Sequence, residues 1–354
     1  EIVAINNRGN NEVSSFLLKH DTIHGQLKAK VTHSDKSILV NDKEIQMSHE
    51  TEISKINWKK YNIDVVLECT GKFNTKDKSA EHLKAGVKKV LVSAPCKGAK
   101  NIVFGVNQKD IKSDDQVISA ASCTTNCLAP VAKIISDNFG VERGFMTTIH
   151  SYTSDQRLLD NSHKDLRRAR SAGNSMIPTT TGATKSLGDV IPELKGKVEG
   201  ISIRVPTPNV SLVEFVFSSN KNLSPEKINE AFLKASKAEL KGILNTSNEH
   251  LVSSDFNHDP HSAIVDLLLT KVSDKKMAKV SAWYDNEWGF ANRMCDLAIY
   301  LGKTKKIMGK LKALDENANI NGKRILVRVD LNVPIKDNKV TDDSRIKKII
   351  PILR

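Results

Sequence analysis

Short apolar runs separated by polar turns mark the first third of the chain. Residues 2–6, 63–68, 90–93 and 117–119 are largely apolar, as is typical of strands buried on both faces of a parallel sheet. Residues 76–85 have the spacing of a helix between two of these strands. The pattern predicts a βαβ unit, and hence an α/β fold with a doubly wound sheet.

The pattern changes after the first third. Residues 198–204, 211–217 and 279–284 alternate or extend like strands of an antiparallel sheet, and residues 225–238 have an amphipathic helical pattern. A last helix is predicted at residues 289–301. We therefore expect a second domain of the α+β class, built on an antiparallel sheet.

Length and cysteine content limit the class of protein. The 354 residues allow two domains with short additional segments, and no apolar run approaches the ~18 residues of a membrane helix. The five cysteines are scattered and lack metal-ligand spacing. We therefore expect reduced thiols, a cytoplasmic location and no metal site.

The formal net charge of +13 is high. Most of the basic side chains are expected on solvated faces, and steering of anionic substrates is the functional alternative. Aromatic residues make up only 5% of the chain and no recognition motif accompanies the charge, so no specific nucleic-acid partner is expected.

The strongest chemical signal is Cys123. The run at residues 116–119 stops at small residues, and the sequence from Thr124 onward predicts a helix, so Cys123 lies at a strand-to-helix turn. The positive end of a helix favours thiolate over thiol, which predicts a nucleophile. Cysteine is more often a small buried hydrophobe, but small and hydroxyl residues flank this one. Cys127, one helical turn further, is expected to pack or to serve as an oxidation partner.

His150 is the candidate base. It ends the apolar segment at residues 144–150, which predicts a buried strand. A cysteine and a histidine at the ends of two strands can act as an activated nucleophile and its base. A structural histidine in the core is the alternative.

Six motifs, in a fixed order and spacing, carry a family resemblance over residues 1 to about 307. They are Ala-Ser-Cys-Thr-Thr-Asn-Cys (121–127), Thr-Ile-His-Ser-Tyr-Thr (148–153), Asp-Leu-Arg-Arg-Ala-Arg (165–170), Ile-Pro-Thr-Thr-Thr-Gly-Ala (177–183), Arg-Val-Pro-Thr-Pro-Asn-Val-Ser (204–211) and Trp-Tyr-Asp-Asn-Glu-Trp-Gly (283–289). This set resembles the phosphorylating glyceraldehyde-3-phosphate dehydrogenases. The resemblance implies a Rossmann cofactor domain at residues 1–122, completed by the helix at residues 289–307, and a catalytic domain at residues 123–288.

The resemblance also implies the chemistry. Glyceraldehyde 3-phosphate would be oxidised with NAD(P) and inorganic phosphate to 1,3-bisphosphoglycerate, through a thioester on Cys123 with His150 as base. The Cys123 N–H is the expected oxyanion donor. By resemblance, the substrate phosphate is held by Thr153 and Arg204, and the attacking phosphate by Ser122, Thr124, Thr181 and Gly182. A homotetramer is expected.

Cofactor contacts are implied at several positions. These are Thr70, Gly71 and Ser93 at strand ends, and Asn286 and Phe290 at the nicotinamide. NAD enzymes place an acidic residue after the second strand of such a sheet, where this chain has Asn7-Arg8. An arginine suits a 2′-phosphate, and Asn161-Ser162 points the same way. We therefore expect NADP in preference to NAD, or use of both; an Arg8 side chain in solvent is the alternative.

Both ends of the chain depart from the family. The chain opens on a segment that resembles the family's second strand, so we expect about 30 residues, with the Gly-x-Gly-x-x-Gly turn, to be missing before it. Its own affinity for the cofactor is therefore open.

Residues 308–354 resemble the start of phosphoglycerate kinase, and Asp330, Asn332 and Arg345 match that family's 3-phosphoglycerate contacts. No kinase activity is expected from so short a piece. The junction is either a fusion or two adjacent genes read as one frame.

Two other functions stay open. Residues 255–266 and 286–294 also resemble a branch that oxidises erythrose 4-phosphate, whereas Thr153, Thr181-Gly182-Ala183 and Pro208 keep the phosphorylating pattern. The second alternative is a non-catalytic fusion that acts as a binding protein through its kinase-like piece.

Overall fold

The computed structural model describes residues 1–307, 335–336 and 339–340. The chain divides into two compact units, Glu1–Gly309 and Lys310–Arg354. In the second unit the structure describes one antiparallel pair, β19 (Ile335–Lys336) with β20 (Lys339–Val340). The predicted kinase-like contacts at Asp330, Asn332 and Arg345 lie outside the described residues.

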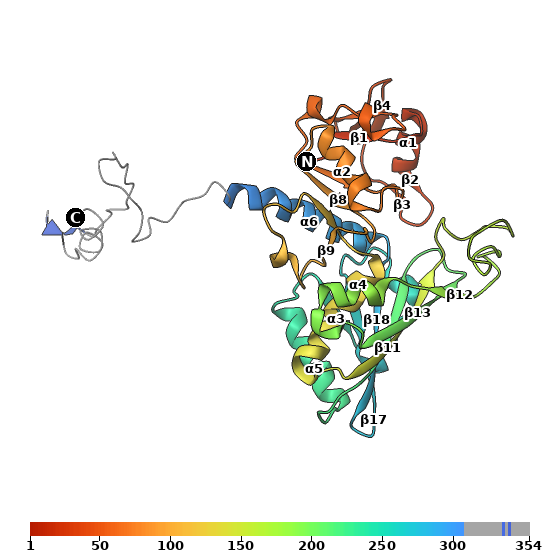
Figure 1. Ribbon diagram of the computed structural model, residues 1–354, viewed down its shortest axis with the longest axis vertical. Coiled ribbons are helices and arrows are strands. Elements are labelled where there is room, and N and C mark those ends of the chain that lie inside the picture. The colour runs from red at the N-terminus through yellow and green to blue at the C-terminus, as the bar shows by residue number, and fades with distance from the viewer. Residues whose placement is uncertain (308–334, 337–338, 341–354) are drawn as a thin grey trace. The chain divides into compact units, whose positions relative to one another are not determined.

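The first lobe of the larger unit contains two four-stranded sheets (Figure 1). One has the order β1 (Ala4–Asn6), β6 (Lys43–Ser48), β5 (Ser37–Val40), β4 (Val31–His33). The other has the order β7 (Val65–Glu68), β8 (Lys89–Val92), β10 (Val117–Ser119), β9 (Lys100–Asn101), and all its pairs are parallel. Helix α2 (Lys76–Lys84) connects β7 to β8 and confirms the predicted βαβ unit.

The predicted parallel strands are divided between these sheets. β1 pairs in parallel with β6, and β7 pairs with β8. Among the residues described, no strand joins β1 to β7. The shorter elements of this lobe are α1 (Asn11–Lys19), β2 (His20–Asp21), β3 (Gly25–Gln26) and the 3-10 helices Ile53–Lys55, Trp58–Tyr61 and Gln108–Asp110.

The second lobe is built on one large sheet with the order β12-β13-β11-β14-β18-β16-β15, with β17 paired to β18. Its strands are β11 (Arg143–Ser151), β12 (Ile177–Thr180), β13 (Val198–Val205), β14 (Ser211–Ser218), β15 (Leu244–Ser247), β16 (Ala263–Asp266), β17 (Lys271–Ser273) and β18 (Met277–Tyr284). The prediction of an antiparallel sheet is wrong for two pairs, β11–β13 and β15–β16, which are parallel. Alternation of apolar residues marks a half-buried strand but does not fix the direction of its neighbour.

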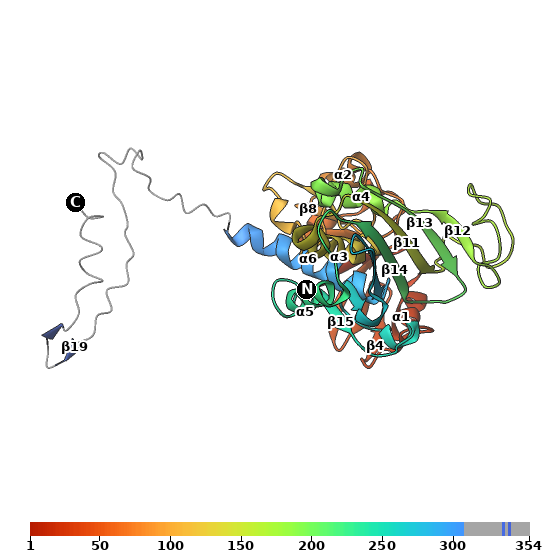
Figure 2. The same cartoon turned by 90° about the horizontal axis from the view of Figure 1, so that it is seen from below.

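Three helices pack on this sheet and supply the main core: α3 (Cys123–Phe139), α4 (Ala183–Val190) and α5 (Pro225–Lys237). They lie together beside the sheet (Figure 2). The 3-10 helices of this lobe are Pro192–Leu194, Ser253–Phe256 and Leu267–Leu269.

Helix α6 (Trp288–Ile307) joins the two lobes. Met294, Leu297 and Leu301 pack with Leu91 of β8 and Ile118 of β10. The last helix therefore returns to the first lobe, as the resemblance implied, and it is six residues longer at its end than the periodicity predicted.

Two kinds of feature are missing from the described part of the chain. No helix there is both long and apolar enough to cross a membrane. No group of three or more histidine, cysteine or acidic residues there is arranged to hold a metal ion.

Candidate active site

The turn that carries Cys123 is tight and strained. β10 ends at Ser119 and α3 begins at Cys123. Between them Ala121 is fully buried with φ of 56°, a left-handed conformation that costs an L-residue roughly 1–2 kcal/mol. Ser122 is the N-cap of α3, and its hydroxyl accepts a hydrogen bond from the Thr125 N–H at 3.1 Å.

Asn126 holds the turn in this conformation. Its amide donates to the carbonyl of Ala120 at 2.8 Å and to that of Ser122 at 2.9 Å. The hydroxyl of Ser119 accepts from the Ala121 N–H at 3.0 Å. These bonds offset the strain at Ala121, so Cys123 occupies the first position of the helix with its N–H outside the helical hydrogen bonds.

His150 reaches Cys123 from the neighbouring sheet. It lies near the end of β11 and is 3% exposed, and its Nε2 is 3.5 Å from the Cys123 sulfur. Its Nδ1 is 2.7 Å from the Ser151 carbonyl oxygen, which can only accept. A proton on Nδ1 would be donated to this oxygen and would leave the Nε2 lone pair facing the thiol, whereas the Arg204 Nη1, a donor 2.9 Å from Nδ1, favours the opposite tautomer.

The surroundings disfavour the charged form of both partners of the pair. Burial and the nearby charge of Arg204 lower the pKa of His150 to about 3. Burial raises the pKa of the Cys123 thiol, against the opposing effects of Arg204 and of Thr124. Burial of the sulfur therefore opposes the effect of the helix N-terminus on the pKa of Cys123.

Arg204 is the cation beside the pair. It lies opposite His150 in the parallel register of β11 and β13. Its Nη1 is 2.9 Å from Nδ1 of His150 and donates to the Ser151 carbonyl at 3.1 Å. Its Nε is buried and, within the described part of the chain, has no hydrogen-bond partner. A buried guanidinium N–H without a partner favours an anion at this point.

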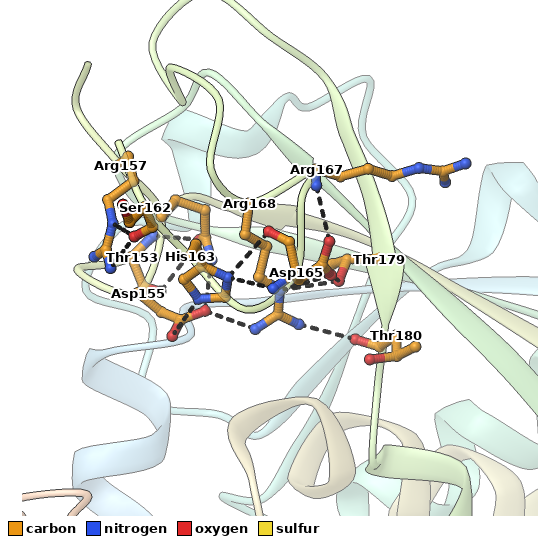
Figure 3. A network of polar contacts seen from close by, with 11 residues as sticks. Thr153, Asp155, Arg157, Ser162, His163, Asp165, Arg167, Arg168, Thr179 and Thr180 are labelled. Carbon is orange, nitrogen blue, oxygen red and sulfur yellow. Dashed lines mark hydrogen bonds and ion pairs between the residues drawn. The ribbon is translucent and has the colours of Figure 1, made fainter. Parts of the chain in front are cut away.

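A polar network fixes the loop beyond Thr153 (Figure 3). The Asp155 carboxylate accepts from Arg168 at 2.6 Å and lies 3.4 Å from His163. Arg168 also donates to the Thr179 hydroxyl at 2.9 Å and to the Thr180 carbonyl at 3.2 Å. The charges of Arg168 and Asp155 act on Arg204, so this network borders the candidate anion site.

Sequence reasoning did not single out Asp155, Arg168 or Tyr284. Arg168 and Tyr284 lie inside two of the six motifs, and Asp155 follows Thr153 by two residues. The Tyr284 hydroxyl bonds to those of Thr124 (3.0 Å) and Thr148 (2.8 Å). Its ring packs edge-on to His150 with centroids 5.9 Å apart. Hydroxyl partners on distant strands leave no signal in local sequence patterns.

The predicted phosphate residues are placed at several loops and helix starts. Thr153 donates its hydroxyl to Gln156 at 3.3 Å. Gly182 is the N-cap of α4, and the Thr181 hydroxyl accepts from the Ala183 N–H at 3.2 Å. Because the hydroxyls of Ser122 and Thr124 bond within the protein, the helix N-termini offer chiefly main-chain N–H groups to an anion.

The predicted cofactor residues form two sets. Thr70 and Gly71 follow β7 and Ser93 follows β8, and the Ser93 N–H donates to the Glu68 carbonyl at 3.0 Å. Asn286 and Phe290 come from the other lobe and α6, with Phe290 packed against the cluster of α6 on the first lobe. These strand ends fit a dinucleotide because such ligands bind at the carboxyl edge of parallel strands.

Asn286 connects the predicted cofactor residues to the Cys123–His150 pair. Its Oδ1 accepts from the hydroxyls of Ser151 and Ser211, each at 2.9 Å. This orients the side-chain amide beside β11, which carries His150.

Asn7 follows β1, and its amide donates to the Ser14 hydroxyl at 3.1 Å, while Arg8 is exposed. Asn7 and Arg8 therefore lie at the end of the strand where the ribose-binding residue was predicted.

Family models match three parts of the chain. Residues 122–286 match the C-terminal domain of glyceraldehyde 3-phosphate dehydrogenase, and residues 1–76 match its NAD-binding domain. Residues 315–354 match phosphoglycerate kinase.

Bacterial proteins are similar over most of their length. A glyceraldehyde-3-phosphate dehydrogenase of Cereibacter sphaeroides is 52% identical over 304 residues, which cover 86% of this chain and 91% of that protein. Those of Bacillus subtilis (number 2) and Zymomonas mobilis are 48% and 50% identical, each with 86% of this chain and 91% of the relative covered.

Proposed function

The chain belongs to the glyceraldehyde-3-phosphate dehydrogenase family of NAD-dependent oxidoreductases, and on this basis we propose that it oxidises glyceraldehyde 3-phosphate to 1,3-bisphosphoglycerate with inorganic phosphate. The observation that carries the proposal is the 3.5 Å approach of His150 Nε2 to the Cys123 sulfur at the start of α3. A nucleophile and a base within reach of each other at a helix N-terminus suit attack on an aldehyde.

The pair acts in two stages. The Cys123 sulfur bonds to the aldehyde carbon while its proton passes to Nε2 of His150, and the new oxyanion lies at the Cys123 N–H. A bound oxidised nicotinamide supplies the acceptor for the hydride that leaves this carbon. The thioester left on Cys123 is cleaved by inorganic phosphate, which yields the acyl phosphate and restores the sulfur for the next turnover.

Two anion sites serve the two phosphates. Arg204, with its buried unpartnered Nε, and Thr153 hold the phosphate of the substrate. The loop before α4, with Thr181 and Gly182, and the start of α3, with Ser122 and Thr124, hold the attacking phosphate. The main-chain N–H groups at both helix starts supply donors without a side-chain charge.

The cofactor is a nicotinamide dinucleotide held by Thr70, Gly71, Ser93, Asn286 and Phe290. We infer a preference for NADP over NAD from Asn7 and Arg8 at the end of β1. Asn7 carries no charge to repel a 2′-phosphate, and the exposed Arg8 can pair with it.

A homotetramer and a cytoplasmic location belong to the same proposal. The segment between β11 and β12 exposes large apolar side chains, namely Leu158 (83%), Leu159 (76%), Leu166 (82%) and Met176 (74%). Such a group suits a surface that another subunit covers.

The test is the rate of dinucleotide reduction with glyceraldehyde 3-phosphate, with and without inorganic phosphate. A faster rate with erythrose 4-phosphate would favour the alternative substrate. No turnover with either aldehyde would favour the non-catalytic alternative, in which the part that matches phosphoglycerate kinase binds a partner. For that part we propose no kinase activity.

A further inference from the structure

The carboxylate of Glu68 is buried at the end of β7, beside the turn at residues 69–72. Only 4% of Glu68 is exposed. Its Oε1 accepts hydrogen bonds from the main-chain N–H of Thr70 at 2.8 Å and from the Thr70 hydroxyl. Its Oε2 lies 2.9 Å from Nε2 of His82, which is buried on α2. Glu68 therefore ties a helix of the first lobe to this turn.

Trp58 determines which group donates in the Trp58–His82 and His82–Glu68 hydrogen bonds. The indole N–H donates to Nδ1 of His82 at 3.0 Å, and an indole has no acceptor. In the neutral ring the proton of His82 is therefore on Nε2 and is donated to Glu68. Burial alone raises the pKa of Glu68, but the bonds from His82 and Thr70 outweigh it and lower the pKa. The chain of donors thus ends on an ionised carboxylate.

The Glu68 carboxylate also determines which hydrogen-bonding groups of the turn at residues 69–72 remain available to a ligand. The Thr70 hydroxyl donates to Glu68 and accepts from the Lys72 N–H at 3.2 Å, so it is used within the turn. Gly71 has φ of +69° and open space where a Cβ would be. The main-chain carbonyl of Glu68 accepts from the Ser93 N–H, which fixes the second strand end. The turn therefore presents main-chain groups, not the Thr70 hydroxyl proton.

We propose that Trp58, His82 and Glu68 form a positioning relay that fixes the turn at residues 69–72 and Ser93 for binding of a dinucleotide. The relay touches no reacting atom. It acts through Thr70 and through the main chain of Glu68. The proposal rests on the function proposed above, since it deepens the cofactor site of that function.

Glu68→Gln is a specific test of the relay. An amide has one accepting oxygen and one donating NH2 group, while Glu68 faces N–H or O–H donors on both oxygens. In either orientation the new NH2 meets a donor. If His82 moves its proton to Nδ1 to accept from the amide, that proton meets the Trp58 indole N–H. Trp58→Phe removes this second conflict, so it is expected to rescue Glu68→Gln.

The first experiment is amide hydrogen exchange of the full chain. Exchange at the Thr70 and Lys72 amides is expected to rise about ten-fold in Glu68→Gln, as for loss of a bond to a charged group, and to return toward the parent rate in Glu68→Gln with Trp58→Phe. Thr70→Val, an isosteric change at an exposed residue, is also expected to raise exchange at these amides. Thr70→Ser keeps the hydroxyl and is expected to leave the exchange rates unchanged. Unchanged exchange in Glu68→Gln and Thr70→Val would overturn the relay.

The second experiment is direct binding of NAD and NADP by calorimetry. Glu68→Gln and Thr70→Val are expected to weaken binding about ten-fold. Val87→Ala, in the same apolar cluster as Trp58, is the control that lowers the melting temperature without touching the turn. If a variant shows faster exchange but binds NAD and NADP as tightly as the parent, the relay does not support dinucleotide binding, and that part of the proposal is overturned. If the parent binds neither dinucleotide, the proposed function fails for this chain, and the exchange rates still decide on the relay.

Discussion

His150 Nε2 lies 3.5 Å from the sulfur of Cys123, although the two residues come from different elements, a helix start and a sheet strand. Burial disfavours the charged form of both groups, so the surroundings favour a neutral thiol beside a neutral imidazole.

Loss of the base is expected to show in the reactivity of Cys123. In His150→Asn the rate of thiol alkylation is expected to fall at neutral pH, and the pH of half-maximal rate is expected to rise, because the imidazole no longer takes the proton. Cys123→Ser should abolish turnover and alkylation at this position. An alkylation profile that His150→Asn leaves unchanged would remove His150 from this role.

Stability is expected to fall in acid because of His150. Its pKa is about 3 in the folded chain, against 6.5 for an ordinary histidine side chain, so the unfolded state binds a proton first as the pH falls. The contribution of His150 to the free energy of unfolding is therefore fully retained above about pH 6.5 and lost toward pH 3, by at most about 1.4 kcal/mol per pH unit. Urea midpoints between pH 7 and 4 measure the slope. His150→Gln should flatten it, and an equal slope in that variant would contradict the assignment.

Arg204 is expected to select phosphorylated substrates. Arg204→Gln should raise the KM for glyceraldehyde 3-phosphate about ten- to a hundred-fold, as for loss of a hydrogen bond to a charged group. Unphosphorylated glyceraldehyde should be affected much less. Arg143→Gln, an exposed arginine at the start of the same strand as His150, is the matched control. Equal losses for both aldehydes would mean that Arg204 acts on the catalytic pair instead.

The segment that matches phosphoglycerate kinase is expected to be dispensable. The larger compact unit ends at Gly309, and α6 ends at Ile307. A chain that stops at Ile307 should keep the melting temperature and the dehydrogenase rate of the full chain. A drop of several degrees would show that the removed residues stabilise the larger unit.

Cofactor preference is expected to follow the end of β1. NADP should have a higher kcat/KM than NAD, and Asn7→Asp combined with Arg8→Leu should shift the ratio toward NAD, because a carboxylate repels the 2′-phosphate and binds ribose hydroxyls. Lys19→Leu, a basic residue at the far end of α1, controls for loss of general positive charge. A clear NAD preference in the parent would reject the NADP inference and leave the aldehyde chemistry untouched.

Local signals were enough to predict much of the fold. Apolar runs located β7, β8 and β10, and the change of character at Ala120–Thr124 located the turn that carries Cys123. What the patterns could not give is pairing between distant strands: the parallel register that sets Arg204 opposite His150 joins residues 54 apart. The patterns also could not give the effect of burial on the pKa of Cys123, because this effect arises only when the fold closes around the sulfur.

The polar network around Arg168 and Tyr284 likewise combines residues that the sequence motifs contain with contacts that only the fold creates. The motifs contained Arg168, Thr148 and Tyr284, but they did not show which side chains bond. The loop of Figure 3 brings Asp155 to Arg168, and β11 brings Thr148 to Tyr284. Likewise, the buried link from Trp58 to Glu68 crosses from a 3-10 helix to a strand end through α2. A sequence shows which side chains can bond, and the topology decides which ones meet.

The division of the first lobe into two sheets has a consequence for the order of folding. One sheet is closed by residues 4–48 and the other by residues 65–119, so each forms from contacts of short sequence separation. The large sheet needs β11, β14 and β18, whose pairings span much longer stretches. Structures with local contacts form faster. During synthesis, Cys123 emerges before the strand that carries His150, so the cysteine spends that interval without its candidate base.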